Sequence, residues 1–186
     1  MENLNRKKVA ILATNGFEES ELKEPLNALK EAGADVDIVS EKSGKIKAWQ
    51  DGNWSNTYNV DKTLDDVSQS NYNALVLPGG VMNPDTLRKN KDAVNFIKSF
   101  FENHKPVAAI CHAPWLLAEA DVLKGRKVTS YASIKKDIIN AGAHWEDSEV
   151  VVDQGLVTSR NPNDLPAFTS KLVEEIYEGK HEMQTA

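Results

Sequence analysis

The stretch Pro106-Val-Ala-Ala-Ile-Cys-His-Ala-Pro-Trp-Leu-Leu-Ala-Glu-Ala120 contains the only cysteine of the chain, Cys111, and His112 follows it directly. Residues 106–110 are apolar and predict a buried strand, whereas residues 114–120 have the apolar spacing of a helix. A buried strand that turns sharply into a helix is the repeating unit of a doubly wound α/β fold. Such a turn also exposes the side chain at its apex, as in a nucleophile elbow. Cys111 is therefore either a buried structural thiol or a nucleophile on a turn.

The rest of the chain continues the alternation of apolar strands and amphipathic helices. We expect strands at residues 8–14, 36–39, 74–77, 128–131, 149–153 and 156–159, the last two joined by a tight turn at 154–155. We expect helices from Ser20, the predicted N-cap, to Gly33, and at 93–101, 134–141 and 165–177. Residues 43–60 predict a small β-hairpin. Continuously apolar strands are buried on both faces, so the fold class is α/β, a flavodoxin-like, doubly wound and mostly parallel sheet flanked by helices.

Composition narrows the class of protein. The 186 residues fit one domain, with residues 1–7 and 180–186 expected to be mobile tails. A net charge of −6 argues against nucleic-acid binding, and no apolar run approaches membrane-spanning length. The polar first residues lack the apolar core of a signal peptide, and a single cysteine excludes an internal disulfide. We therefore expect a cytoplasmic protein without nucleic-acid or membrane partners.

Metal and cofactor signals are weak in the sequence. One cysteine and four dispersed histidines do not give a metal-ligand spacing, and no glycine-rich nucleotide motif is present. We therefore predict neither a cofactor nor a metal. Three histidines show no context that suggests a role: His104, His144 and His181.

Three loops that follow predicted strands carry the chemistry: residues 15–20, 78–85 and 111–113. The carboxyl ends of parallel strands meet at one edge of the sheet, so these loops are expected to converge. The N–H groups and macrodipole of the helix after Cys111 favour an anion, and we expect them to lower the pKa of the thiol. On position alone, the structural and the nucleophilic interpretations of Cys111 are evenly balanced.

Each group in these loops also has a possible role in catalysis. His112 is a candidate general base or ion-pair partner for the thiol. The Gly79-Gly80 turn, together with the N–H that follows the nucleophile, suits an oxyanion hole, although it is also a plain tight turn. Glu18 lies nearest the strand end, and in a low-polarity crevice its carboxyl would stay protonated and hydrogen-bond the sulfur. Its alternative role is that of a charge at a helix N-terminus.

The chain resembles the PfpI-type intracellular proteases of the ThiJ/PfpI superfamily, whose fold is like that of class I glutamine amidotransferase domains. The resemblance runs in order through almost the whole chain. It rests on residues 16–19, 74–80, 106–112, 123–127, 138–142, 149–153 and 157–160 with 164–165.

The resemblance implies specific roles. Cys111 would be the nucleophile and His112 its partner, with Glu18 as the carboxyl that contacts the thiol. Gly80 and the backbone N–H of His112 would form the oxyanion hole. Asp85, from a neighbouring subunit, would complete a triad, so a homo-oligomer is expected.

One departure from the family pattern lies beside the thiol. Ala113 stands where many relatives have glycine, and Trp115 follows closely. Both side chains are expected to narrow the substrate pocket.

Three functional hypotheses follow. The leading one is a cysteine-dependent hydrolase that acts on peptide, amide or glycated-carbonyl substrates in stress response. The second uses the same thiol on small aldehydes, as a glyoxalase or deglycase. The third is a redox sensor or chaperone-like stress protein with an oxidisable Cys111.

Overall fold

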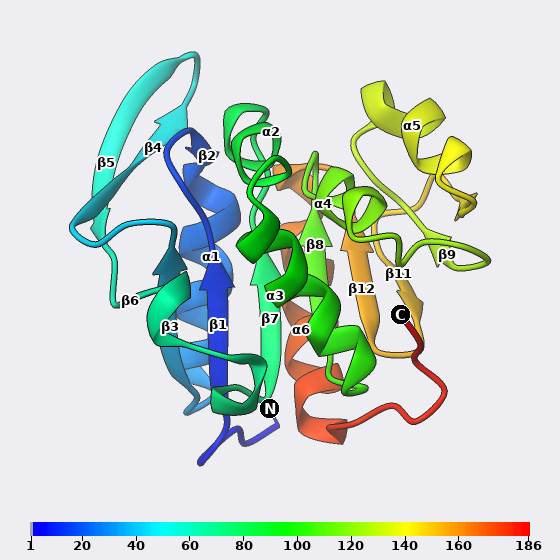
Figure 1. Cartoon of the computed structure of the whole chain (residues 1–186), viewed down its shortest axis with the longest axis horizontal. Helices are drawn as coiled ribbons and strands as arrows, with labels where there is room; N and C mark the ends of the chain where they lie inside the picture. The colour runs from blue at the N-terminus through cyan, green and yellow to red at the C-terminus, as the bar shows by residue number, and fades with distance from the viewer. Residues whose placement is uncertain (1) are drawn as a thin grey trace.

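The computed structural model describes residues 2–186 and contains a central sheet of seven strands, in the order β11-β12-β8-β7-β1-β3-β6 (Figure 1). The strands are β1 (Lys8–Leu12), β3 (Asp35–Ser40), β6 (Lys62–Thr63), β7 (Ala74–Leu77), β8 (Val107–Ile110), β11 (Val151–Asp153) and β12 (Leu156–Ser159). Neighbouring strands are parallel except β11 and β12, which are antiparallel. The predicted doubly wound, mostly parallel α/β sheet is confirmed.

Helices cover both faces of this sheet (Figure 1). Two pack on one face, α1 (Glu19–Glu31) and α6 (Leu165–Glu178), and two on the other, α3 (Lys91–Glu102) and α4 (Pro114–Glu119). Shorter helices, α2 (Met82–Leu87) and α5 (Lys135–Asn140), lie toward the carboxyl edge of the sheet. Within residues 2–186, no helix has the length and apolar character needed to cross a membrane.

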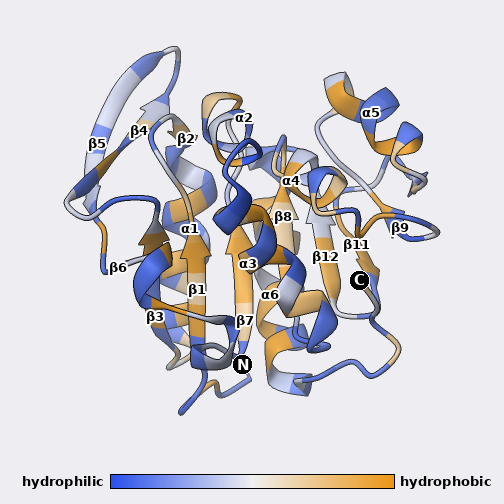
Figure 2. Ribbon diagram, viewed as in Figure 1, coloured by the Kyte–Doolittle hydropathy of each residue, from blue (hydrophilic) through white to orange (hydrophobic). Residues whose placement is uncertain are grey.

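Strand β1 is apolar at successive positions, without the alternation of apolar and polar residues that is typical of a half-exposed strand. Ile11 packs with Leu29 and Phe168 on one face of the sheet, whereas the next residue, Leu12, packs with Phe100 on the other. Successive side chains of a strand point to opposite faces, and here both faces are covered. Figure 2 shows the result as hydrophobic strands between helices whose outer surfaces are hydrophilic.

Two small sheets flank the large one. The predicted hairpin is present as β4 (Lys45–Gln50) and β5 (Asn53–Asn59), and β4 also pairs with β2 (Phe17–Glu18). The strand expected at 128–131 is shorter and lies outside the main sheet. It ends at Val128 as β9 (Lys127–Val128), which pairs with β10 (His144–Trp145). The chain from 129 onward instead turns back over the carboxyl edge, where it meets the Cys111 loop.

Residues of both chain ends, where the sequence predicted mobile tails, make contacts with the rest of the domain. Leu4 is fully buried, and its N–H donates to the Ala32 carbonyl. At the other end Gln184 is fully buried, and Arg126 donates a hydrogen bond to the carbonyl of Thr185. These contacts pack residues of both ends against the sheet and its helices. The part of that prediction that concerns residue 1 lies outside the described residues.

Candidate active site

Cys111 occupies a sharp turn between β8 and α4. Its φ of +65° lies in the left-handed region, which a side chain with a β-carbon rarely adopts. The surrounding backbone holds this conformation, because the Cys111 N–H donates to Ser159 over 3.0 Å and its carbonyl accepts from Tyr131 over 2.8 Å. Strain that is held in this way is typical of functional sites. The turn therefore has the backbone geometry of a nucleophile elbow.

The three predicted loops do converge, and they line a cavity of about 390 Å³. Gly16 and Glu18 come from the loop after β1, Gly80 to Met82 from the loop after β7, and Cys111 and His112 from the elbow. The remaining wall is built by residues that the sequence did not single out: Glu21, Trp49, Tyr131 and Pro162. A thiol, an imidazole and two carboxyls thus share one small volume.

The carboxyl at the thiol is Glu21, whereas the sequence predicted Glu18. Glu21 is fully buried, contacts the Cys111 thiol, and accepts a hydrogen bond from the Gly79 N–H over 3.0 Å. Glu18 lines the cavity but belongs to β2, where it pairs with Trp49. The helix begins at Glu19, so Ser20 is not its N-cap, and it is the first turn of α1 that delivers the carboxyl.

Burial sets the protonation of Glu21. The pKa of this carboxyl is raised from 4.5 to about 8, first by burial and then by the charge of Glu18, against smaller opposing effects of the thiol and the Gly79 and Gly80 N–H groups. Its Oε1 is buried, and no group among residues 2–186 forms a hydrogen bond of normal geometry with it. Glu21 is therefore protonated at neutral pH. A carboxylic acid beside the sulfur can donate a hydrogen bond to it.

The thiol itself differs from the predicted low-pKa cysteine. Burial raises the pKa of Cys111, an ionised Glu21 would raise it further, and the N–H groups of Gly80 and His112 act in the opposite direction. Helix α4 has only six residues, and its N-terminus does not offset the loss of water around the sulfur. Protonation of Glu21 removes the repulsion between the two groups. The resting cysteine is thus a buried thiol that needs a base.

His112 is placed to be that base. Its Nδ1 lies 3.1 Å from Cys111 Sγ, so the predicted contact between these neighbours in sequence is present. Burial lowers the pKa of the imidazole, which keeps it neutral and able to accept a proton. The ring stacks on Tyr131 at 4.7 Å, and its Nε2 lies 3.2 Å from the Ser133 hydroxyl. These two contacts fix the direction of the ring.

The Gly-Gly turn fits closely against the elbow. A β-carbon on Gly79 would lie 2.6 Å from Cys111 Cβ and 2.7 Å from the Ile110 carbonyl, so only glycine fits there. The Gly79 N–H is taken by Glu21, which leaves the N–H groups of Gly80 and His112 facing the sulfur. These two donors are the available oxyanion site.

Two other predicted site residues lie elsewhere. Ala113 does not line the cavity: its side chain is buried in the core and its N–H donates to Ile110 over 3.0 Å. It therefore cannot serve the oxyanion site. Asp85 is exposed on α2 and is absent from the cavity wall formed by residues 2–186. Within one chain the neighbour of His112 Nε2 is Ser133, and delivery of Asp85 by a second copy stays a prediction.

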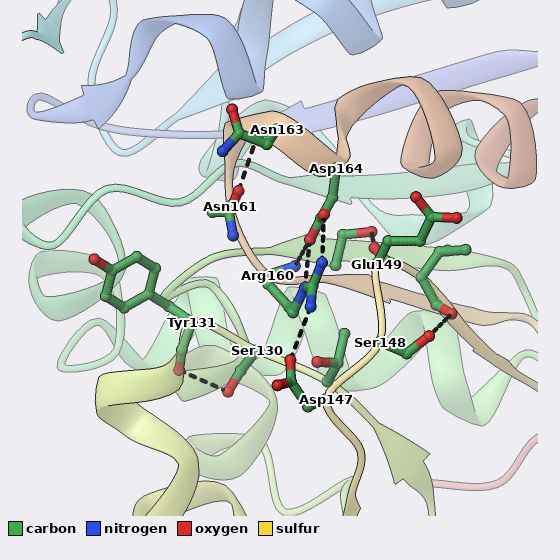
Figure 3. A network of polar contacts seen from close by, with 12 residues as sticks. Ser130, Tyr131, Asp147, Ser148, Glu149, Arg160, Asn161, Asn163 and Asp164 are labelled. Atoms are coloured by element: carbon green, nitrogen blue, oxygen red, sulfur yellow. Dashed lines mark hydrogen bonds and ion pairs between the residues drawn. The ribbon is translucent and has the colours of Figure 1, made fainter.

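An ion-pair cluster is centred on Arg160 (Figure 3), two residues before Pro162 of the cavity wall. Arg160 donates twice to Asp164, over 2.9 Å from both Nε and Nη2, and once to Asp147 over 2.8 Å. Its bidentate geometry fixes the loop between β12 and α6. The sequence did not predict this wall. Pro162 and Tyr131 lie in segments that connect the main strands and helices, and hydrophobic periodicity predicts only helices and strands.

Comparison with known proteins identifies the family. Residues 7–175 match the DJ-1/PfpI family. The protein named Deglycase TK1284, of Thermococcus kodakarensis, is 48% identical over 166 residues, which cover 89% of this chain and 97% of that protein. "Putative cysteine protease YraA" of Bacillus subtilis is 46% identical over 162 residues, with coverages of 87% and 94%.

A solved structure leads to the same family. The crystal structure of a two-domain protein from Anabaena variabilis, which contains DJ-1/ThiJ/PfpI-like and ferritin-like domains, matches with a TM-score of 0.87 and 38% identity. The match covers 92% of this chain and 48% of that one. With a family match over almost its whole length, this chain belongs to the DJ-1/PfpI family.

Proposed function

We propose that the protein is a cysteine-dependent hydrolase that releases amines from small amide or glycated-carbonyl substrates. The observation that carries the proposal is the cavity in which Cys111 Sγ, His112 Nδ1 and the protonated Glu21 meet, with the Gly80 and His112 N–H groups beside the sulfur. A cavity of about 390 Å³ suits a small group rather than a long peptide. The names of TK1284 and YraA, a deglycase and a cysteine protease, fit the same class of chemistry.

The mechanism follows from these contacts. As Sγ of Cys111 attacks the substrate carbonyl carbon, the thiol proton passes to Nδ1 of His112. The carbonyl oxygen gains negative charge, and the N–H groups of Gly80 and His112 stabilise it. Before and during the attack, the O–H of Glu21 donates a hydrogen bond to Sγ of Cys111, and Glu21 keeps its own proton while the thiol loses its proton to His112. For an amide substrate, His112 then returns the proton to the leaving amine, and water hydrolyses the remaining thioester to a carboxylic acid and the free Cys111 thiol.

The orientation of His112 has two proposed sources. Ser133 Oγ lies 3.2 Å from Nε2 within the same chain, and in the proposed tautomer Nε2 donates to it, which leaves Nδ1 unprotonated and free to take the thiol proton. Asp85, exposed on α2, is the proposed carboxylate from a neighbouring copy. Turnover that depends on protein concentration and falls in Asp85→Asn supports the second source. Loss of turnover in Ser133→Ala alone supports the first.

A redox-sensor function is less well supported. Rapid oxidation needs an exposed thiolate. Cys111 is only 6% exposed, and burial raises its pKa. Slow oxidation by dilute peroxide, measured by mass spectrometry beside normal turnover, is the expected result.

The test of the proposed function is a substrate panel with Cys111→Ala. The panel contains peptides glycated on lysine or arginine, fluorogenic amino-acid amides, and methylglyoxal. We expect the wild type to release amine and Cys111→Ala to be inactive, with Glu24→Gln, an exposed change on α1, as the control. Full amine release by Cys111→Ala would refute the proposal. Consumption of methylglyoxal without any amine release would establish the aldehyde function instead.

A further inference from the structure

The C-terminal end of α6 contains a second group of titratable side chains, away from the cavity. Glu175 and Glu178 lie three residues apart in the last turn, and Gly179, with a φ of +92°, ends the helix and turns the chain back to His181. The ligand atoms of these three side chains lie within 4.8 Å of one another. Nε2 of His181 is 3.1 Å from Oε2 of Glu175. We propose that Glu175, Glu178 and His181 form a binding site for a divalent transition-metal ion of the zinc type.

Burial is the first support for the site. Glu175 is only 6% exposed. Its Oε2 and the Nε2 of His181 are buried and, apart from their contact with each other, have no polar partner among residues 2–186. A buried carboxylate beside two further acidic residues, Glu174 and Glu178, is costly unless a cation neutralises it. Lys171 is bound to Glu174 over 2.7 Å, so the group that faces Glu175 is the His181 imidazole.

A fourth buried side chain points to the same place. Gln184 is fully buried, yet neither its Oε1 nor its Nε2 has a hydrogen-bond partner within residues 2–186. Both Gln184 and His181 pack over Gly155: a β-carbon there would lie 2.8 Å from His181 Cδ2 and 3.2 Å from Gln184 Oε1. Because both atoms lie near that one point, the amide oxygen is at most about 6 Å from Cδ2, the ring carbon bonded to Nε2. Buried polar groups without partners are rare in native proteins and call for a ligand or ordered water.

The backbone holds His181 in this position. Its N–H donates to the His104 carbonyl over 2.9 Å, and its carbonyl accepts from the Gln184 N–H over 2.8 Å. His104 Nδ1 in turn lies 2.5 Å from the Gln184 carbonyl. The imidazole is therefore presented by a fixed segment, which lowers the entropy cost of assembling ligands.

The donor set selects the class of ion. One imidazole nitrogen with two carboxylates, and an amide oxygen in reach, matches the nitrogen and oxygen ligands of four-coordinate zinc. Calcium and magnesium prefer oxygen ligands alone. The carboxyl end of a long helix also favours a cation. Sequence spacing did not reveal the group, because a helix end and a glycine turn separate the glutamates from the histidine.

The test uses the full chain with the Cys111→Ala change, so that the thiol cannot bind metal. After treatment with EDTA, ZnCl2 is titrated by calorimetry. We expect saturable binding of one ion per chain, weakened at least about tenfold in Glu178→Gln and in His181→Gln. Glu182→Gln, an exposed change in the same segment, should bind like the parent.

Two further measurements complete the test. CoCl2 should give the visible absorption bands of a tetrahedral site, and His181→Gln should remove them. MgCl2 should not compete with zinc. Absence of saturable binding, or unchanged zinc affinity in both variants, would overturn the proposal and leave only an ion pair between His181 and Glu175. Because Glu178 is exposed, its variant is expected to fold normally.

Discussion

The first turn of α1 contains two glutamates, Glu19 and Glu21, whose carboxyl pKa values are shifted in opposite directions. Glu19 faces the β4–β5 hairpin, where Ser55, Asn56 and Tyr58 donate hydrogen bonds to its carboxylate, and its pKa is lowered to about 2, chiefly by Ser55. Glu21, two residues later, faces the cavity, where burial raises its pKa to about 8. Both carboxyls are at most 4% exposed.

The difference reflects both the loss of water around each carboxyl and the groups that donate hydrogen bonds to it. Three side-chain donors stabilise the anion at Glu19, and it ties the hairpin to the helix. At Glu21 the hydrogen bonds of the Cys111 thiol and of the Gly79 and Gly80 N–H groups do not offset the loss of water, so the neutral acid persists. The first carboxyl connects the hairpin to the helix, and the second keeps a proton next to Cys111.

The largest expected effect is the loss of the Glu21 proton donor. Glu21→Ala removes the group that contacts the sulfur, and we expect turnover to fall by about a hundredfold or more, the range of a lost acid–base group. Glu21→Gln keeps an N–H donor of similar shape and should retain more activity than the alanine variant. The measurement is the rate of amine release at pH 7. Equal rates in wild type and Glu21→Ala would contradict the assigned role.

The second effect is on stability as pH rises. A carboxyl with a raised pKa in the folded state contributes stability below pH 4.5, and that contribution is lost as pH increases to about 8. The loss amounts to roughly 3 to 5 kcal/mol of unfolding free energy for a fully buried group. Urea unfolding between pH 5 and 8 should therefore show wild type losing stability relative to Glu21→Gln. A constant difference between the two proteins would argue against a raised pKa.

Glu19 is expected to give a smaller effect of opposite sign. Its pKa is lowered, so its contribution is present above pH 4.5 and is lost as pH falls toward about 2. Glu19→Gln should reduce the unfolding free energy at pH 7 by about 1.5 to 3 kcal/mol, the usual value of hydrogen bonds to a charged group. Urea unfolding measures this, with the exposed Glu24→Gln as the matched control. A Glu19→Gln protein as stable as its control would contradict the tie between hairpin and helix.

The smallest effect is expected at Glu18. This carboxyl lines the cavity without contact to the thiol, so Glu18→Gln should change the rate of amine release by about threefold or less, well below the range of a lost acid–base group. A loss as large as that of Glu21→Ala would reinstate Glu18 as the carboxyl at the sulfur.

Sequence patterns located the turn that carries Cys111 because its signal is local. The apolar strand before Cys111 and the helix after it define the elbow, and the Gly79-Gly80 turn must end at the same sheet edge. Local sequence does not determine which carboxyl, Glu18 or Glu21, contacts the thiol. The choice depends on where α1 begins and how its first turn is rotated against the Gly-Gly turn, which the spacing of acidic residues cannot specify.

Other differences have the same origin. Tyr131 and Ser133 reach His112 because the strand at β9 ends early and the chain crosses the carboxyl edge. The polar composition after Gly179 predicted a mobile tail, yet Gln184 and His181 pack over Gly155. In both cases tertiary contacts, rather than local propensity, decide the structure.

The most direct test of the central claim, that Glu21 beside Cys111 is protonated at neutral pH, is infrared difference spectroscopy. Wild type and Glu21→Gln are compared from pH 5 to 10, and the carbonyl stretch of a protonated carboxyl is followed. The expected result is a carboxylic-acid band at pH 7 that disappears with a midpoint near 8 and is absent from Glu21→Gln. A Glu21 carboxyl that is already ionised at pH 7, with no such band, would contradict this assignment.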